Sequence, residues 1–382
     1  MTLSSSVWTG YSFKEEIPLV FAAQQKNSRA VRSPTADTRS SLLLGLRDVI
    51  PTALYKDTTH PLDTVGSFET TGGLGSIDRA LENLDEWMAT ALVTGSKVAA
   101  SGYARYEVRC VLLLFAAGNF PLTQLFEPQV LIIAAGSTVF VKTYETSPTS
   151  GRLVAAILRK VFAENEVAAY GGKVDLAALV ELPFNRIFLT GCPKVSRTAI
   201  AAAAKHFASV TLELGGKSPL MVDKAPDFGD PVQQLAVGKT FNLGQACTSS
   251  DQVMVPISRH DEFVDRPSAF RSQMLYVDCV DQPEQTSRVV NESNSQRLQG
   301  RLSDVPARSA KVAFGDGTEA AKLIIKPTIF LDAPFDADVM QKAPCFPLLA
   351  TTMPRRSLPR CRQALNRWPC SSSRPMKRSS SA

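Results

Sequence analysis

The sequence lacks three features that would each assign the protein to a class. No apolar run reaches the roughly 18 residues of a membrane-spanning helix, and the longest runs, near 111–117 and 130–135, are typical of buried strands or helices. No basic start leads into an apolar core within residues 1–18, so no secretory signal is expected. The seven cysteines are irregularly spaced and form no metal-binding pattern. These absences predict a protein of the reducing cytoplasm, without a membrane span or a metal centre.

Acidic residues are absent from residues 355–382, a Ser/Arg-rich segment that holds seven Arg and one Lys. The rest of the chain carries 34 basic and 36 acidic groups, so the overall formal charge of +6 belongs to this tail. A specific nucleic-acid-binding face is therefore not predicted for the body. The tail has little hydrophobic periodicity, and we expect it to be disordered or to be the translation of a shifted reading frame.

The body of the chain alternates between strand-like and helix-like segments. Its 382 residues, 44% of them hydrophobic, are enough for two domains with substantial cores. Residues 1–40 are weakly patterned. Expected helices cover 39–50, 77–91, 124–135, 149–163 and 195–207, and expected strands begin at 108 and cover 138–142, 186–190, 209–212 and 253–256. This βαβ alternation predicts an α/β fold with a parallel, Rossmann-like sheet, although no Gly-x-Gly-x-x-Gly fingerprint is present.

Two short segments carry the residue types of a thiol-based active site. The strand at 209–212 leads into Glu213 and then Gly215-Gly216, which places a carboxylate at a strand end beside a cleft. Gly244-Gln245-Ala246-Cys247 falls on or near an irregular connection, where a thiol can be exposed and reactive. Alone, Cys247 reads as a small buried hydrophobe and Glu213 as a solvated carboxylate. Their occurrence together favours a functional pair.

The sequence resembles the aldehyde dehydrogenase superfamily over about residues 15–350. Glu213-Leu214-Gly215-Gly216-Lys217 and Gly244-Gln245-Ala246-Cys247 are similar to the family's general-base and thiol segments. Three further segments are similar to family motifs and occur in the family's order: Asn119-Phe120-Pro121, Val141-Lys142 with Glu145, and Phe188-Leu189-Thr190-Gly191. Leu182-Pro183-Phe184-Asn185-Arg186, Val289-Val290-Asn291 and Arg297-Leu298-Gln299-Gly300 are most similar to the coniferyl-aldehyde and class 3 branch.

The resemblance implies oxidation of an aromatic or medium-chain aldehyde to the acid with NAD or NADP. Cys247 would attack the aldehyde, and Asn119 with the backbone N–H of Cys247 would hold the oxyanion. Glu213 would activate the water that hydrolyses the thioester, a role that benefits from partial burial and a raised pKa. Read without the resemblance, Asn119 is a loop-capping side chain.

The resemblance also implies a set of cofactor-binding residues. Lys142 would donate to the adenosine ribose hydroxyls and Glu145 would accept from them, although such a pair can also be plain surface charge. The loop of Gly191 and Cys192 would lead the pyrophosphate to a helix N-terminus. Leu214 and Gly215, which follow the expected strand, complete the set of expected contacts.

The sequence predicts three regions along the chain and is compatible with two functions other than aldehyde oxidation. We expect an NAD(P)-binding domain with an N-terminal helical segment at 1–212, a partial catalytic domain at 213–354 and the tail at 355–382, with the homodimer usual in the family. Where the family has Glu and Phe near the nicotinamide, this chain has Ala343 and Cys345, and Ser196 replaces a glycine. These substitutions support an inactive relic or binding protein. A Cys-dependent esterase remains the third alternative, because it needs the thiol but no nicotinamide.

Overall fold

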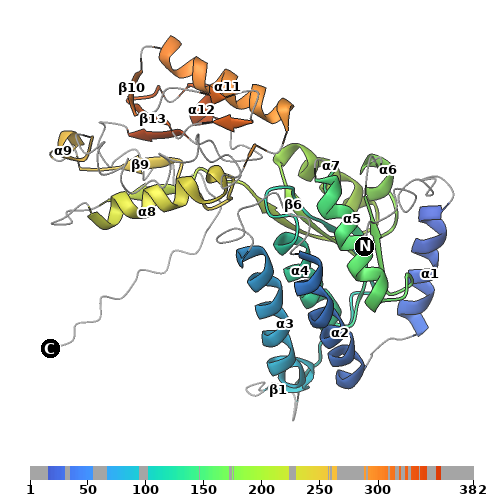
Figure 1. Ribbon diagram of the computed structural model, residues 1–382. Coiled ribbons are helices and arrows are strands. Elements are labelled where there is room, and N and C mark those ends of the chain that lie inside the picture. Colours follow the sequence, from blue (N-terminus) through green and yellow to red (C-terminus); the bar gives the residue numbers. More distant parts are fainter. Residues whose placement is uncertain are drawn as a thin grey trace, which may run out of the picture.

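Figure 1 shows the computed structural model of the protein, in which two five-stranded sheets organise most of the elements. The structure describes residues 16–30, 35–54, 67–93, 102–145, 147–171, 174, 176–222, 229–256, 258, 260–264, 288–289, 291–308, 310–314, 318–319, 323–325, 328–334, 336–341 and 350–353. The tail at 355–382 and the predicted substitution sites Ala343 and Cys345 lie outside the described residues. No helix in the described part is long and apolar enough to cross a membrane.

The first sheet is entirely parallel, with strand order β5-β4-β3-β6-β7. Its strands are β3 (Val111–Phe115), β4 (Thr138–Lys142), β5 (Val167–Tyr170), β6 (Arg186–Gly191) and β7 (Ser209–Leu214). The residues of β3, β4 and β5 are all buried, as expected for a parallel sheet covered on both faces. The predicted α/β fold is confirmed.

Helices cover both faces of this sheet because successive strand residues point to opposite sides. Leu112 and Leu114 of β3 join a core formed with α2 (Ala36–Leu54), α3 (Ser67–Met88), α4 (Thr123–Ala134) and α5 (Pro148–Val161). Val111, Leu113 and Phe115 join the opposite core, which is formed with α1 (Glu16–Ala30), α6 (Leu176–Val180) and α7 (Pro193–Lys205). Figure 1 shows α2, α3 and α4 grouped away from α1 and α6. The predicted helices at 39–50, 124–135, 149–163 and 195–207 correspond to α2, α4, α5 and α7.

Helix α1 is a helix that the sequence pattern did not predict. Its buried face includes Ile17 and Phe21, but it continues with polar Gln24 and Ser28, both of which are buried. The Gln24 side-chain amide donates to the carbonyl oxygens of Val139 (3.0 Å) and Glu164 (3.2 Å). Oγ of Ser28 donates to the carbonyl oxygen of Gln25 in the same helix at 3.1 Å. Hydrophobic periodicity misses such a face because buried polar residues, paired with backbone carbonyl oxygens, occupy positions where apolar residues are expected.

Helix α3 begins ten residues before the predicted start at Ile77, in spite of three glycines in its first half. Glycine normally disfavours a helix interior, so the segment before Ile77 does not read as helical. Gly72 has a packing reason, because a Cβ at this position would lie 2.6 Å from Oε1 of Glu127 on α4. Gly72 therefore allows α3 to pack closely on α4, although a glycine weakens the helical pattern of the sequence.

The second sheet is mixed, with strand order β10-β13-β14-β9-β8. Its strands are β8 (Pro219–Met221), β9 (Gln252–Met254), β10 (Lys311–Phe314), β13 (Thr328–Leu331) and β14 (Ala350–Met353), and only the β10–β13 pair is antiparallel. One core joins it to α8 (Gly229–Thr240) and α9 (His260–Val264), and another joins it to α11 (Glu292–Ala307) and α12 (Asp338–Gln341). Short pairs are formed by β1 (Ala91–Val93) with β2 (Gly102–Ala104) and by β11 (Thr318–Glu319) with β12 (Ile324–Ile325).

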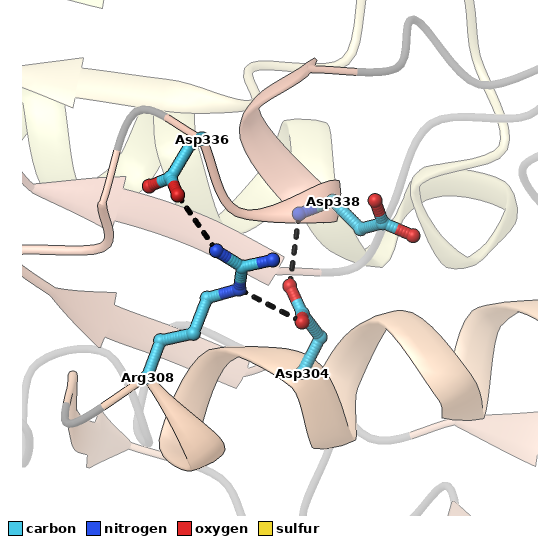
Figure 2. A network of polar contacts seen from close by, with 4 residues as sticks. All are labelled: Asp304, Arg308, Asp336 and Asp338. Carbon is cyan, nitrogen blue, oxygen red and sulfur yellow. Dashed lines mark hydrogen bonds and ion pairs between the residues drawn. The ribbon is translucent and has the colours of Figure 1, made fainter.

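A polar network joins the end of α11 to the segment that enters α12. Figure 2 shows Arg308 between two carboxylates, with its Nε 2.9 Å from Oδ1 of Asp304 and its Nη1 2.8 Å from Oδ2 of Asp336. The backbone N–H of Asp338 donates to the other carboxylate oxygen of Asp304 at 2.9 Å. The hydrogen bond that Arg308 donates to Asp304 is the main reason that the pKa of Arg308 is raised. Asp338 is in the first turn of α12, where a neighbouring carboxylate satisfies an unpaired N–H.

Candidate active site

The carboxyl edge of the first sheet gathers most of the predicted site residues. Lys142 is the last residue of β4, and Gly191 is the last residue of β6. In the register of β6 and β7, Glu213 lies opposite Thr190 and Leu214 lies opposite Gly191. Asn119 lies in the connection that follows β3. Ligands of open parallel sheets bind at this edge, so the topology alone places these residues where a site is expected.

The side chain of Asn119 is buried and held by hydrogen bonds at both of its ends. Its Nδ2 donates to the carbonyl oxygen of Gln245 at 2.9 Å, and its Oδ1 accepts from Nε2 of Gln124 at 3.0 Å. Oε1 of Gln124 in turn accepts from the backbone N–H of Ala117 at 3.1 Å. This network fixes which end of the amide is the donor. One Nδ2 hydrogen is used on Gln245, which leaves the second for another acceptor.

The segment before Cys247 is bent by three consecutive residues with positive φ. Helix α8 is followed by the 3-10 turn η3 (Phe241–Gly244), in which φ is 49° at Asn242, 52° at Leu243 and 67° at Gly244. Asparagine and glycine tolerate this conformation, but leucine adopts it only under strain. Nδ2 of Asn242 donates to the carbonyl oxygen of Asn119 at 2.7 Å, and Asn242 and Leu243 are both buried. Burial and this bond hold the bend in place.

Gln245 connects the bend to a second part of the chain. Its side chain is buried, and its Nε2 donates to the carbonyl oxygens of Asn242 (3.1 Å) and Arg288 (3.0 Å). Its own carbonyl accepts the Asn119 amide. The side chain and the main chain of Gln245 therefore both hold the backbone in place two residues before Cys247.

Cys247 is exposed, in a turn that directly follows this fixed segment. The prediction of an irregular connection is confirmed, and the interpretation as a buried hydrophobe is wrong. Oγ of Ser218 donates to the carbonyl oxygen of Cys247 at 3.1 Å. Ser218 lies four residues after Leu214, the end of β7, so the segment that follows Glu213 runs beside the thiol segment.

Glu213 lies near the end of β7, as predicted, but its side chain is exposed. The expected partial burial of this carboxylate is therefore not found. The burial pattern explains the difference, because Glu213 and Leu214 are the two exposed residues of a strand whose other four residues are half-buried. Gly215, which follows β7, is half-buried.

Buried charges tie the segment after Glu213 to the segment after Cys247. Lys217 forms an ion pair with the buried Asp251, and its Nζ also donates to the carbonyl oxygen of Val339 at 2.5 Å. The backbone N–H of Asp251 donates to the carbonyl oxygen of Ser218 at 3.2 Å. Burial lowers the pKa of the nearby Lys239 to about 8, although the Asp251 carboxylate opposes the shift. A buried charge needs such a partner to be tolerated.

Lys142 is buried at the end of β4, so the interpretation of this residue as plain surface charge is wrong. Its Nζ donates to the carbonyl oxygen of Thr143 at 2.7 Å and lies 3.6 Å from Oε1 of Glu145. Burial lowers the pKa of Lys142, and Glu145 opposes this shift. Glu145 is about half exposed, whereas Lys142 is buried. The carboxylate of Glu145 therefore faces solvent next to the ammonium group of Lys142.

Gly191 and Cys192 lead from β6 into the N-terminus of α7. Cys192 is the N-cap residue, in extended conformation and without a side-chain capping bond, and Pro193 starts the helix. The buried Ser196 turns its Oγ back to the carbonyl oxygen of Cys192 at 3.0 Å. The hydroxyl therefore points into its own helix turn. The N-terminus of a 13-residue helix at a sheet edge is suited to an anionic group.

Sequence reasoning missed the side chains that hold the site together. Gln124, Asn242, Gln245 and Ser218 each bond a predicted residue or its neighbour. The one local signal was the Gly-Gln pair before Cys247. Gln124 lies five residues after Asn119 but matches no quoted motif, and the contacts of Asn242 and Ser218 join segments that are 123 and 29 residues apart. Within the described part, no group of three or more His, Cys, Asp and Glu side chains could hold a metal ion.

Comparison with known proteins gives one consistent result. The model of the aldehyde dehydrogenase family matches residues 11–357. The AldX protein of Bacillus subtilis, named as an aldehyde dehydrogenase, is 32% identical over 340 residues, which cover 86% of this chain and 76% of AldX. A coniferyl aldehyde dehydrogenase of a Pseudomonas species is 30% identical over 284 residues, covering 74% of this chain and 59% of that protein.

A solved structure supports the same assignment. The substrate-bound AldH of Staphylococcus aureus superposes with a TM-score of 0.82 at 25% identity, covering 92% of this chain and 78% of that chain. Both the order of the motifs and the arrangement of the two sheets therefore agree with one family. The chain belongs to the aldehyde dehydrogenase family.

Proposed function

We propose that the protein oxidises an aromatic or medium-chain aldehyde to the carboxylic acid with NAD or NADP, through a thioester on Cys247. The observation that carries this proposal is the Asn119 side chain, whose amide nitrogen is held 2.9 Å from the carbonyl oxygen of Gln245, two residues before the exposed thiol. The similarity to a coniferyl aldehyde dehydrogenase supports an aromatic substrate.

Cys247 and Asn119 carry the first step of the proposed reaction. The thiolate of Cys247 adds to the carbonyl carbon, and the carbonyl oxygen takes up the electron pair as an oxyanion. The second Nδ2 hydrogen of Asn119 and the backbone N–H of Cys247 donate to this oxygen. A preorganised donor of this kind contributes roughly 3–4 kcal/mol to transition-state stabilisation. Collapse of the oxyanion with loss of a hydride leaves the acyl group on the sulfur.

Glu213 carries the proposed second step. Its carboxylate takes a proton from a water molecule, whose oxygen attacks the thioester carbon. The carbon–sulfur bond then breaks, which releases the carboxylic acid and returns Cys247 as the thiolate. The exposed position of Glu213 leaves it open to water, and the Ser218 bond to Cys247 keeps its segment beside the thiol segment.

The residues at the sheet edge fit a dinucleotide. Lys142 has a buried stem and an ammonium group beside Glu145, so the two offer a donor and an acceptor for ribose hydroxyls. Gly191, Cys192 and the N-terminus of α7 suit the pyrophosphate. Leu214 and Gly215 lie next to Gly191 across the β6–β7 pair. NAD or NADP, when bound, accepts the hydride that the aldehyde carbon loses.

The proposed function is tested by following reduced-cofactor absorbance with the full chain. Benzaldehyde, a cinnamaldehyde and a medium-chain aliphatic aldehyde are each offered with NAD and with NADP. We expect turnover that is abolished by Cys247→Ala, with Cys110→Ala as the matched control, because Cys110 is a free cysteine away from the site. Turnover that survives Cys247→Ala contradicts the proposal.

Two further readouts distinguish the alternatives. Folded protein that binds neither cofactor in calorimetry would support the relic. Hydrolysis of a nitrophenyl ester without any aldehyde oxidation would support the esterase, which needs Cys247 and Asn119 but not Lys142. The three-domain division, the homodimer and the cytoplasmic location stay predictions.

A further inference from the structure

We infer that the first turn of α3 positions the loop that carries Asn119, with Glu69 as a positioning residue and Phe68 as its packing partner. This inference rests on the proposed function, because it gives Asn119 a catalytic task. Neither side chain reaches the reacting atoms, so their effect on the reaction passes through the loop.

Glu69 satisfies the N-terminus of a helix that has no cap of its own. The N-cap position of α4 is Leu122, whose side chain cannot accept a hydrogen bond. Oε2 of Glu69 accepts instead from the backbone N–H groups of Leu122 (3.0 Å) and Thr123 (2.7 Å). Oγ1 of Thr123 also donates to the carbonyl oxygen of Glu69 at 3.4 Å. A residue more than fifty positions away in sequence therefore does the work of a local cap.

Glu69 is held in an unfavourable place for a carboxylate. It is 1% exposed, and its Oε1 is among the buried oxygens with no hydrogen-bond partner. Burial raises the pKa of Glu69 to about 7, and the neighbouring Glu127 carboxylate adds a smaller rise. A buried acid with one unsatisfied oxygen is costly for the fold. Its position is explained by the two N–H groups that it binds.

Phe68 makes the second contact between α3 and the site. Its ring centroid lies 5.3 Å from that of Phe120 and 5.5 Å from that of Phe241. Phe120 directly follows Asn119, and Phe241 directly precedes Asn242, whose side chain donates to the carbonyl of Asn119. Phe120 and Phe241 also stack on each other at 5.6 Å. Phe68 thus packs against both segments that meet at the candidate site.

The Asn119 loop is consequently fixed on two sides. Gln124 and Gln245 hold the amide itself, and Glu69 with Phe68 holds the backbone from Phe120 to Thr123. Loss of the second support would let the loop shift while the network around Gln245 survives. Because an oxyanion donor must be aligned to within a fraction of an ångström, such a shift lowers kcat.

The test compares Glu69→Ala with Glu69→Gln in the full chain, with Glu127→Gln as control. We expect Glu69→Ala to lower kcat by roughly 10- to 100-fold while the KM for the cofactor changes less than about twofold. Glu69→Gln should restore kcat to within about threefold of the parent, because the amide oxygen can still accept both N–H groups. Glu127→Gln removes a carboxylate of the same helix pair that makes no contact with these N–H groups, so kcat should not change.

A second measurement does not depend on turnover. Hydrogen–deuterium exchange of the peptide at 117–124 should be faster in Glu69→Ala than in the parent and should return to the parent rate in Glu69→Gln. If the parent protein oxidises no aldehyde, the proposed function fails, and this exchange still decides whether Glu69 holds the loop. Unchanged exchange in Glu69→Ala overturns the inference, as does a Glu69→Gln variant as defective as Glu69→Ala.

Phe68→Ala covers the case in which Glu69→Ala does not fold. Phe68 is 44% exposed, so its truncation removes the ring contacts and costs less buried area than truncation of a fully buried phenylalanine would. We expect faster exchange at 117–124 and a kcat reduced by roughly 3- to 10-fold, with cofactor KM unchanged. Parent-like exchange and kcat in Phe68→Ala would overturn the inference independently of Glu69.

Discussion

The polar network around Asn119 and the network around Arg308 have bonds of similar length but lie in different surroundings. The Asn119 bonds measure 2.7 to 3.0 Å and involve the buried residues Asn119, Asn242 and Gln245 together with the half-buried Gln124. The Arg308 bonds measure 2.8 to 2.9 Å, and Figure 2 shows them between the end of α11 and the segment that enters α12, where the side chain of Asp336 is 78% exposed. Water can replace the second set of partners but not the first.

This difference decides what each network can do. A buried amide that loses its partner is left unsatisfied, so the bonds around Asn119 are strict constraints on geometry. An exposed ion pair gains little because solvent and salt compete for both partners. Bond length alone therefore does not indicate importance, and the buried network is the one that can support catalysis.

The largest expected effect is on activity, from Asn119→Ala. Loss of the amide donor should lower kcat/KM by roughly 100- to 1000-fold, the range seen when one oxyanion donor is removed. Steady-state oxidation of the best aldehyde measures the effect. Asn83→Ala is the matched control, because the half-buried side chain of Asn83 donates to the carbonyl oxygen of Arg79 in its own helix. Equal rates for the parent and Asn119→Ala would show that the buried network around Asn119 does not support catalysis.

The next effect concerns the pH dependence of stability and comes from Glu69. Its pKa is raised from 4.5 to about 7 in the folded protein. Below pH 4.5 both the folded and the unfolded state hold the proton, so this group costs no stability. Between pH 4.5 and 7 only the unfolded state releases it, so the free energy of unfolding falls as pH rises, by roughly 3 kcal/mol in all.

Urea unfolding of the parent and Glu69→Gln at pH 5 and pH 8 measures this contribution. Glu69→Gln cannot ionise, so its stability relative to the parent should be greater at pH 8 than at pH 5. The comparison between variants removes the titration of other carboxylates. A stability difference that is independent of pH would show that the environment of Glu69 does not disfavour its charge.

Gln245→Ala should reduce stability by a smaller amount, about 1–3 kcal/mol. The substitution removes the two bonds that Nε2 makes to the carbonyl oxygens of Asn242 and Arg288, and leaves the acceptor on the buried Asn242 without this partner. Urea unfolding at constant pH measures the change. Gln296→Ala is the control, because Gln296 bonds the exposed Glu292 at 3.2 Å and should have almost no effect. Equal losses for both variants would contradict the contrast between buried and exposed networks.

The smallest effect is expected for Arg308→Ala. The urea midpoint should stay within experimental error of the parent, because solvent takes over the groups that Arg308 binds. Any small change should also disappear in high salt. A clear loss of stability that persists in high salt would show that the exposed network contributes as the buried one does.

The sequence predicted the fold where the elements follow local rules. The strands β3, β4 and β6 are short apolar runs and their crossover helices have apolar residues at helical spacing, and these elements were found near the predicted bounds. Helix α1 was missed because Gln24 and Ser28 occupy its buried face. Helix α3 was predicted short because the glycines in its first half weaken the helical pattern, and one of them, Gly72, faces Glu127 and Thr123 of α4. Both cases depend on tertiary contacts that replace local preference.

The site was predictable only where residues match known motifs. Asn119, Glu213 and Cys247 were identified by family resemblance, and the structure places Asn119 against the thiol segment. The exposure of Glu213 was not foreseen, because burial depends on what packs around the end of β7. Glu69 gave no sequence signal, since its partners Leu122 and Thr123 are more than fifty residues away and are backbone groups.

The central claim, that Cys247 and Glu213 divide the reaction between them, is tested most directly by mass spectrometry of the Glu213→Gln variant. The variant is mixed with a benzaldehyde and the cofactor, quenched in acid and digested. The account predicts an acyl group on the Cys247 peptide, two hydrogens lighter than the simple aldehyde adduct, together with about one reduced cofactor per chain. An unmodified Cys247 in a sample that has reduced the cofactor would contradict it.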